Sequence, residues 1–272
     1  MEDEDEARSF LLNNNYYRIS GYTLTLRNHD KFYPSVSFRH IMEIYNFDRE
    51  FRILLLSVIE RIEVSVKSVY AYEFSGKHGP FGYLESACFI NEEVHKEIIT
   101  KSDAQMKRRI SHEAFLKHFV EERNETIPFW AYVDLFTISD ISRLYTISED
   151  DIKRKIAKHF GMTFIKAPFV MKQYLYGLTI LRNLCAHGSR IYNRLFVTKP
   201  DLNKRELSIL RKDRDGNPDN SKVFGYLLII KRILDPASFY EFSSALKALC
   251  VKYPFVDMKH YGFCDSWQDV FA

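Results

Sequence analysis

The feature that most constrains the fold is a long stretch of helical periodicity in the first third of the chain. From Asn46 to about Ser75, apolar residues recur at steps of three and four with charged residues between them: Phe47, Phe51, Leu54, Leu55, Val58, Ile62, Val66 and Val69. This is the period of an α-helix with one apolar face, so the stretch predicts a single helix of about eight turns. The helix is expected to end at the sequence GKHGP, which supplies two glycines and a proline.

The remainder of the chain also favours helices. A charged tract from Asn91 to Glu122 predicts a solvent-exposed helix, and shorter helices are predicted in FWAYVDLFTI, in SEDDIKRKIAKHF with Ser148 or Asp150 as N-cap, and in PFVMKQYLYGLTILRNLCAH. Only RLFVTK and the stretch around FGYLLII are compatible with strands, and the second fits a buried helix equally well. The segment KDRDGNPDNSK predicts a loop.

These segments together predict an all-α fold, a helical bundle with additional helices around an aromatic-rich core. We expect a single domain over residues 1–272. It comprises an N-terminal helical block at 1–45, a core at 46–194 and a C-terminal helical extension at 195–272.

Composition indicates a folded globular protein, since 46% of the 272 residues are apolar and 15% are aromatic. The net charge of +3 permits an anionic partner without by itself indicating nucleic-acid binding. The four cysteines have no close spacing, which predicts neither a zinc site nor a disulfide framework. The acidic start MEDEDEARSF lacks the pattern of a secretory signal, and no apolar run is as long as a membrane span, so we expect a cytoplasmic protein with no membrane contact.

The stretch LRNLCAHGSRIYNR places Arg182, Asn183 and His187 at the end of a predicted helix, just before Gly188. Asn183 and His187 are one helical turn apart, and the long Arg182 side chain must reach around to join them. An imidazole carries protons near neutral pH and a guanidinium grips a phosphate at two points, so the trio suits phosphodiester chemistry.

On RNA, the ribose 2′-hydroxyl would attack, His187 would remove its proton and Arg182 would stabilise charge on the phosphate oxygens, with no metal or cofactor. Leaving-group protonation calls for a second acid/base group, which a homodimer would supply.

The spacing alone is weak evidence for a site. An arginine followed five positions later by a histidine occurs again at Arg154 and His159, in a segment with the charge pattern of a solvated helix face. By spacing alone, an ordinary polar helix end is the favoured interpretation of the first copy as well.

Longer blocks separate the two copies. RNLCAH resembles the RNxxxH signature of HEPN-type ribonucleases, and the chain around it resembles the Abi-like abortive-infection proteins of bacteria, of the AbiD/AbiF type. Besides LRNLCAHGSRIYNR, the resemblance rests on FLLNNNYYRISGY, FDREFRILLLSVIERIEVSVKSVYAYEFSGKHGPFGYL, FWAYVDLFTISDISRLY and IAKHFGM, in the order of the family. It covers most of the chain from Arg8 to Arg194.

The resemblance implies a HEPN fold, a metal-independent RNA endonuclease with a composite dimeric site, and a role in bacterial anti-phage defence or toxin-like growth arrest. Arg182 and His187 match the catalytic positions, and Asn183 matches the polar residue that follows the arginine. RNA is the implied partner, in some relatives a small noncoding RNA, and an antitoxin or regulatory partner is compatible with the toxin-like role. Relatives usually carry a further segment before NNYYR, which implies a truncated start here.

Several other residues are candidates for the site, each with an ordinary structural alternative. Glu60 is a candidate for orienting Arg182 or His187, whereas Glu63 is expected to pair with Lys67 within the helix. The candidate RNA contacts, with helix-end complementation or a solvated helix face as the alternative, are Arg190, Asn193, Arg194, Lys107, Arg108 and Arg109. Tyr16, Tyr17 and Tyr22 suit base stacking, but core packing is the favoured interpretation in so aromatic a chain.

Two functions therefore remain in contention, an RNA endonuclease and a non-catalytic module of the same fold that binds RNA or protein. A purely structural helical scaffold is a lesser third. The intact arginine, asparagine and histidine favour the nuclease.

Overall fold

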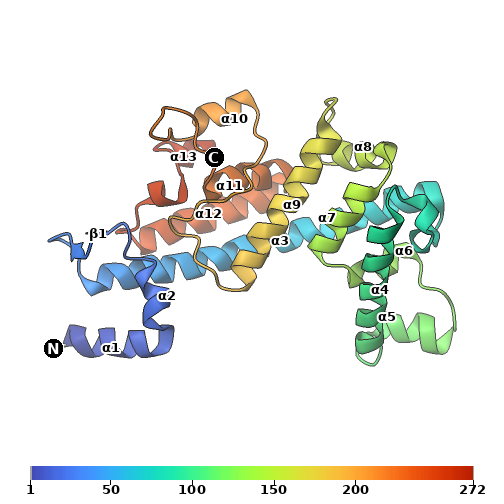
Figure 1. Ribbon diagram of the computed structural model, residues 1–272, viewed down its shortest axis with the longest axis horizontal. Helices are drawn as coiled ribbons and strands as arrows, with labels where there is room; N and C mark the ends of the chain where they lie inside the picture. Colours follow the sequence, from blue (N-terminus) through green and yellow to red (C-terminus); the bar gives the residue numbers. More distant parts are fainter. Residues whose placement is uncertain (1, 272) are drawn as a thin grey trace. The chain divides into compact units, whose positions relative to one another are not determined.

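A computed structural model of the protein confirms the all-α fold. It describes residues 2–271, with side chains from residue 4. Within that range the strands are β1 (Arg27–Asn28) and β2 (Lys31–Phe32), which form an antiparallel hairpin. The chain forms two compact units, residues 1–59 with 180–272 and residues 60–179, whose boundaries fall inside two long helices (Figure 1). The predicted boundaries near residues 45 and 194 are different, and the number of domains stays a prediction.

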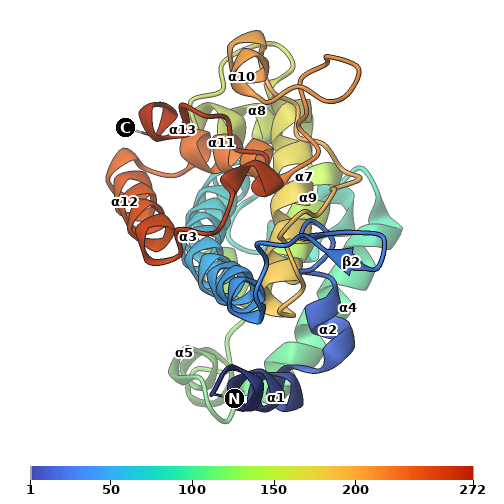
Figure 2. The same cartoon turned by 90° about the vertical axis from the view of Figure 1, so that its left-hand side faces the viewer.

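The first unit holds both ends of the chain. It contains α1 (Glu2–Asn14), α2 (Tyr16–Ser20), the hairpin, the first half of α3 (Phe38–His78), the end of α9 (Ala167–Ala186), α10 (Lys204–Ile209), α11 (Val223–Ile233), α12 (Pro236–Lys252), the 3-10 helix η5 (Met258–Tyr261) and α13 (Trp267–Val270). Figures 1 and 2 both show α12 beside the first half of α3. There Phe47 packs edge-on against Tyr253, with the ring centroids 6.2 Å apart.

The second unit is built on the other half of α3. It adds η1 (Gly82–Leu84), η2 (Ser86–Cys88), α4 (Glu92–Arg109), α5 (Ala114–Leu116), the π-helical turn η3 (Lys117–Glu122), α6 (Phe129–Tyr132), η4 (Val133–Leu135), α7 (Ile138–Ile147), α8 (Asp150–His159) and the start of α9. Its core is aromatic, as predicted: Tyr70, Tyr83 and Phe129 are buried, and the Phe129 ring lies 5.0 Å from that of Tyr83.

The predicted central helix is longer than its periodicity suggested. α3 begins at Phe38, eight residues before the predicted start at Asn46. The backbone N–H of Ser37 donates to Nδ1 of His40 (3.1 Å), and Ile41, Ile44 and Tyr45 continue the buried face. The apolar period of α3 thus begins at Ile41, and the side chain of His40 caps the turn before it.

Two predicted helices are broken. The tract Asn91–Glu122 is wrong as one helix, since α4 ends at Arg109 and two short turns follow. FWAYVDLFTI is also divided, because Thr137 and Asp140 form a reciprocal capping box that starts α7 after the 3-10 turn. For α8 the N-cap is Glu149, between the two predicted residues, and it makes no side-chain capping bond.

Neither of the two stretches that are compatible with a strand forms one. FGYLLII lies within α11, whose residues from Val223 to Ile230 are all buried, and RLFVTK is irregular. A helix buried on all sides lacks the polar face by which periodicity separates helices from strands. Within residues 2–271, no helix combines the length and apolar character needed to cross a bilayer.

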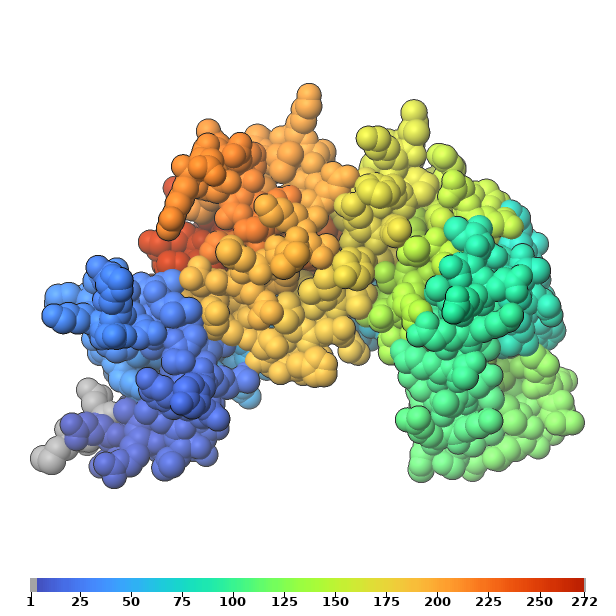
Figure 3. Space-filling model, in the orientation of Figure 1, coloured from blue at the N-terminus to red at the C-terminus, as the bar shows by residue number. Residues whose placement is uncertain are grey.

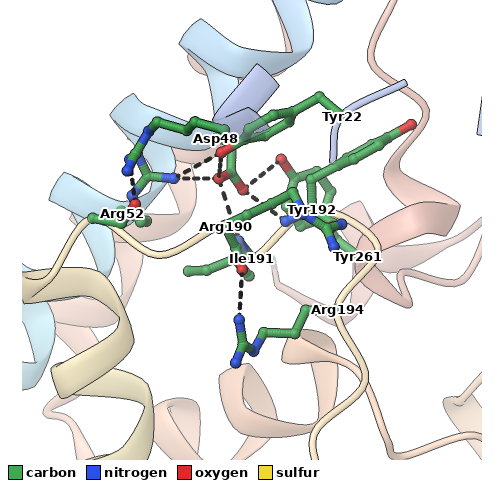
Figure 4. Close-up of polar contacts among 10 residues, drawn as sticks. Tyr22, Asp48, Arg52, Arg190, Ile191, Tyr192, Arg194 and Tyr261 are labelled. Carbon is green, nitrogen blue, oxygen red and sulfur yellow. Dashed lines mark hydrogen bonds and ion pairs between the residues drawn. The ribbon is translucent and has the colours of Figure 1, made fainter. Parts of the chain in front are cut away.

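The buried carboxylate of Asp48 joins four parts of the first unit (Figure 4). It pairs with Arg52 one turn along α3 and accepts hydrogen bonds from the hydroxyls of Tyr22 (2.7 Å) and Tyr261 (3.0 Å). The backbone N–H groups of Ile191 (3.3 Å) and Tyr192 (2.8 Å) also donate to it. One side chain thus fixes the N-terminal block, α3, the segment after α9 and η5.

Burial and the neighbouring groups shift the pKa of Asp48 in opposite directions. Burial raises the pKa of the Asp48 carboxyl, while the Arg52 guanidinium and the Tyr22 hydroxyl act to lower it. Arg52 is itself buried, with 4% of its surface exposed. A buried charge left without its partner is costly, so the stability of the unit depends on both members being present.

We expect Asp48→Asn to lower the free energy of unfolding by about 3–5 kcal/mol, because Arg52 would remain buried without a counter-charge. Urea unfolding followed by circular dichroism measures the change. Glu50→Gln is the matched control. Glu50 is also on α3, but it pairs with Lys252 of α12 at the surface, so its loss should lower the free energy of unfolding far less. Equal losses in the two variants would contradict a central role for Asp48.

Candidate functional site

The end of α9 is closed by a left-handed glycine. His187 follows the last helical residue and its backbone N–H still donates to the Asn183 carbonyl (3.0 Å). Gly188 has a φ of +63°, and the N–H groups of Gly188 and Ser189 donate to Cys185 (3.0 Å) and Leu184 (2.8 Å). This pair of bonds is the Schellman motif, so the predicted helix end at Gly188 is confirmed and His187 sits at the C-cap.

The polar residues of the sequence motif face solvent and its apolar residues face the core. Leu181 and Cys185 are buried, whereas Arg182 is half-buried and Asn183 and His187 are exposed. An Arg182 Nη donates to Oδ1 of Asn183 at 3.4 Å, which brings these two side chains together. His187 lies one helical turn after Asn183, as their backbone hydrogen bond shows.

Cys185 lies inside the motif but is unsuited to nucleophilic chemistry. Burial raises the pKa of its thiol to about 12. The thiolate is the reactive form of cysteine, so this side chain acts as a small core residue near neutral pH.

A residue far away in the sequence holds the turn after His187. Arg18, in α2, donates a hydrogen bond to the Gly188 carbonyl. The fit is close, since a Cβ placed on Gly188 would lie 3.1 Å from Nη2 of Arg18. Figure 3 shows the blue N-terminal block abutting the golden segment that follows α9.

The three predicted RNA contacts after the motif are engaged within the protein. Arg190 donates to the Tyr192 carbonyl, and Arg194 donates to the Arg190 carbonyl at 3.4 Å (Figure 4). Asn193 takes a left-handed φ of +49°, and its Oδ1 accepts from Nζ of Lys222 at 2.8 Å. Their position beside the motif suits RNA binding, but these bonds also give each of them a structural role, and contact with RNA stays a prediction.

The arginines around this turn share one electrostatic property. Each has a neutral oxygen as its hydrogen-bond acceptor, and within the described residues none of them forms an ion pair with a carboxylate: Arg18, Arg182, Arg190 and Arg194. The nearby carboxylate of Asp48 is committed to Arg52. The turn therefore carries several uncompensated positive charges, which suits an anionic ligand.

The other predicted residues belong to the second unit. Glu60 is exposed on α3, and its role in orienting the motif stays a prediction, whereas the expected Glu63–Lys67 pair is confirmed at 2.9 Å. Lys107 and Arg108 are exposed at the end of α4, and Arg109 pairs with Glu113 at 2.6 Å.

The second copy of the arginine–histidine spacing has the surroundings of a solvated face. Arg154 and His159 are both exposed on α8, whose Ile152 and Ile156 are buried. Among residues 2–271 no three histidine, cysteine or acidic side chains gather as a metal site would require.

The tyrosines of the N-terminal block divide between core and surface. Tyr22 is fully buried, in agreement with core packing, but that interpretation is wrong for Tyr16 and Tyr17, which are 65% and 83% exposed. Asp48 is not among the predicted site residues, although its spacing from Ile44 and Phe51 places it in the apolar stripe of α3. A charged residue at such a position is a sequence signal of a buried polar cluster.

Comparison with known proteins identifies a family. A family profile described as Abi-like protein matches residues 9–193. No curated protein and no solved structure matches the chain.

His260 supports the segment after the motif from η5. Its ring packs edge-on against Tyr192 at 5.2 Å, and its carbonyl accepts from the Asn193 N–H at 3.2 Å. Burial lowers the pKa of its imidazole to about 4, with Lys259 and Lys222 also lowering it and Asp257 opposing. The folded protein thus holds this ring neutral at pH values where an unfolded chain protonates it.

We expect the protein to lose stability as the pH falls from about 6.5 to 4, by up to ~1 kcal/mol per pH unit from His260 alone. In this window the His260 imidazole binds a proton in the unfolded chain but not in the folded protein, so acid favours unfolding. Urea unfolding at several pH values, compared between the parent and His260→Gln, isolates this part of the pH dependence. Identical slopes for the two proteins would contradict it.

Proposed function

Because the chain belongs to the Abi-like protein family, we propose that it acts in abortive-infection defence as a metal-independent RNA endonuclease. In this proposal His187 is the general acid/base and Arg182 stabilises the transition state. Asn183 holds the Arg182 side chain through their hydrogen bond.

The observation that carries the proposal is the set of arginines without carboxylate partners around His187. An exposed imidazole beside uncompensated guanidinium groups provides both a proton carrier and a binding surface for phosphate. The Arg182 side chain bonds to that of Asn183, which lies one helical turn before His187 on the same face of α9.

The reaction follows from these groups. His187 removes the proton of the ribose 2′-hydroxyl, the 2′-oxygen forms a bond to phosphorus, and the bond from phosphorus to the 5′-oxygen breaks. Arg182 stabilises the negative charge on the phosphate oxygens as the bonds exchange. The leaving 5′-oxygen takes up a proton, so the products carry a 2′,3′-cyclic phosphate and a 5′-hydroxyl.

A second copy of the chain supplies the second proton carrier. Each chain contributes one motif histidine, and a two-fold dimer would place two of them at one phosphodiester. One His187 then acts as the base, while its counterpart donates the proton to the leaving oxygen.

The second candidate function is RNA binding without cleavage, in a non-catalytic module of the defence system. The same four arginines favour it, because they would attract a phosphate backbone whether or not His187 reacts.

We expect the purified protein to cleave RNA equally well with and without EDTA, and His187→Ala to slow cleavage by about 10²–10⁴-fold. Arg182→Ala should also slow it, since charge on the phosphate oxygens would lose its stabilising partner. Gel analysis of labelled RNA, with detection of the cyclic phosphate end, measures both effects.

His159→Ala is the matched control, because His159 shares the spacing from an arginine but lies exposed at the end of α8, in the second unit. It should cut as fast as the parent. If His187→Ala retains full activity, this mechanism is wrong. Loss of all cleavage in EDTA would contradict metal-independent chemistry.

We expect activity to fall with the square of the parent fraction when the parent and His187→Ala chains are co-refolded at varied ratios. The reason is that a composite site works only when both histidines are present. Cleavage rates across the series, with dimer formation checked by sedimentation, provide the measurement. A linear decrease would show that each chain acts alone.

A further inference from the structure

The N-terminal block has a side-chain-capped turn that presents two tyrosines to solvent. Asn15 adopts a left-handed φ of +58°, and its Oδ1 accepts the backbone N–H of Tyr17 at 2.9 Å. Tyr16 and Tyr17 pack edge-on, with their ring centroids 5.6 Å apart. This side-chain cap fixes the backbone at the start of α2, from which the two exposed rings project.

The next residue, Arg18, connects this turn to the candidate site. It is exposed, donates one hydrogen bond to the Gly188 carbonyl and lies over the Tyr45 ring at 5.9 Å. No other hydrogen bond and no ion pair of its guanidinium occurs within the described residues. A guanidinium has five N–H donors. Arg18 uses one of them on Gly188, the residue after His187, so its other donors have no partner within the described residues.

The contrast with the buried side of the same block is informative. Tyr22 points into the core and donates to Asp48, whose charge compensates Arg52. Arg18 has no such acid and keeps its charge at the surface. Anchoring a carbonyl needs only a single neutral donor, so neither the remaining donors nor the exposed tyrosines are explained by the fold.

We propose that Arg18 binds a phosphate of the RNA strand at the His187 turn and that Tyr17 stacks on an unpaired base beside it. The inference rests on the proposed function for its ligand, and it assigns the substrate-binding subsite to α2. Charge-assisted bonds from a planar guanidinium match phosphate oxygens, and an exposed aromatic ring stacks on any base that is not paired. The subsite therefore selects single-stranded RNA.

The test measures RNA binding in the His187→Ala background, where cleavage does not interfere. The probe is a short fluorescent single-stranded RNA of mixed sequence, followed by anisotropy over a series of KCl concentrations, with the blunt duplex of the same sequence for comparison. Arg18→Gln keeps an amide N–H for the Gly188 carbonyl but removes the charge. It should weaken binding by about tenfold and make the slope of log K against log salt shallower by about 0.7.

Tyr17→Ala should weaken binding of the single strand by about tenfold, leave the salt slope unchanged and leave duplex binding unchanged. Tyr17→Phe should bind as the parent does, because the ring is retained. The matched controls are Arg214→Gln and Tyr240→Ala, which alter an exposed arginine and an exposed tyrosine elsewhere in the first unit. Neither should change affinity or slope.

Two results overturn the proposal: an Arg18→Gln protein with the parent affinity and salt slope, or a Tyr17→Ala protein that loses nothing or loses single-strand and duplex binding equally. The outcome is separate from that of the proposed function. A parent that binds RNA through Arg18 but never cuts it defeats the nuclease and keeps the subsite. Cleavage that requires His187 but does not depend on Arg18 keeps the nuclease and defeats the subsite.

Discussion

The first unit depends on one buried ion pair. Asp48 lies in the apolar stripe of α3, and its two oxygens accept every donor that the surrounding segments direct at them: a guanidinium, two tyrosine hydroxyls and two backbone N–H groups. A carboxylate in the core is tolerated only with such saturation. As a result, the backbone after the motif is bonded to α3 at Ile191, four residues after His187.

A second contact restrains the turn itself, nearer to His187. Arg18 holds the Gly188 carbonyl, where the left-handed φ of the glycine closes α9 and leaves His187 exposed at the helix end. Two separate restraints therefore hold the backbone segment that directly follows the candidate acid/base. The arginines of the turn lack carboxylate partners, so the fold orders this surface without neutralising it, a combination that suits a ligand with negative charge.

The sequence predicted much of this arrangement. Periodicity identified α3, and Gly188 marked the end of α9, because a stripe of apolar residues and a left-handed glycine are local signals. Periodicity leaves FGYLLII open between a strand and a buried helix, because burial on all sides removes the polar face. It fails for the tract after Asn91, where helical charge patterns continue across a break. The aromatic composition of the chain favours the core for Tyr16 and Tyr17, and this prediction is wrong. Composition does not determine whether a ring in a turn faces the core or the solvent.

The sequence by itself determined the helical class, the family blocks and the identity of Arg182, Asn183 and His187, since these depend on residue type and spacing along the chain. Tertiary structure alone decided that Asp48 gathers the segments around the motif and that Arg18 reaches Gly188, 170 residues away. It also showed that Arg190 and Arg194 turn to backbone carbonyls. The physical reason is that hydrogen-bond partners and charge compensation depend on distance in space, which local sequence patterns do not encode.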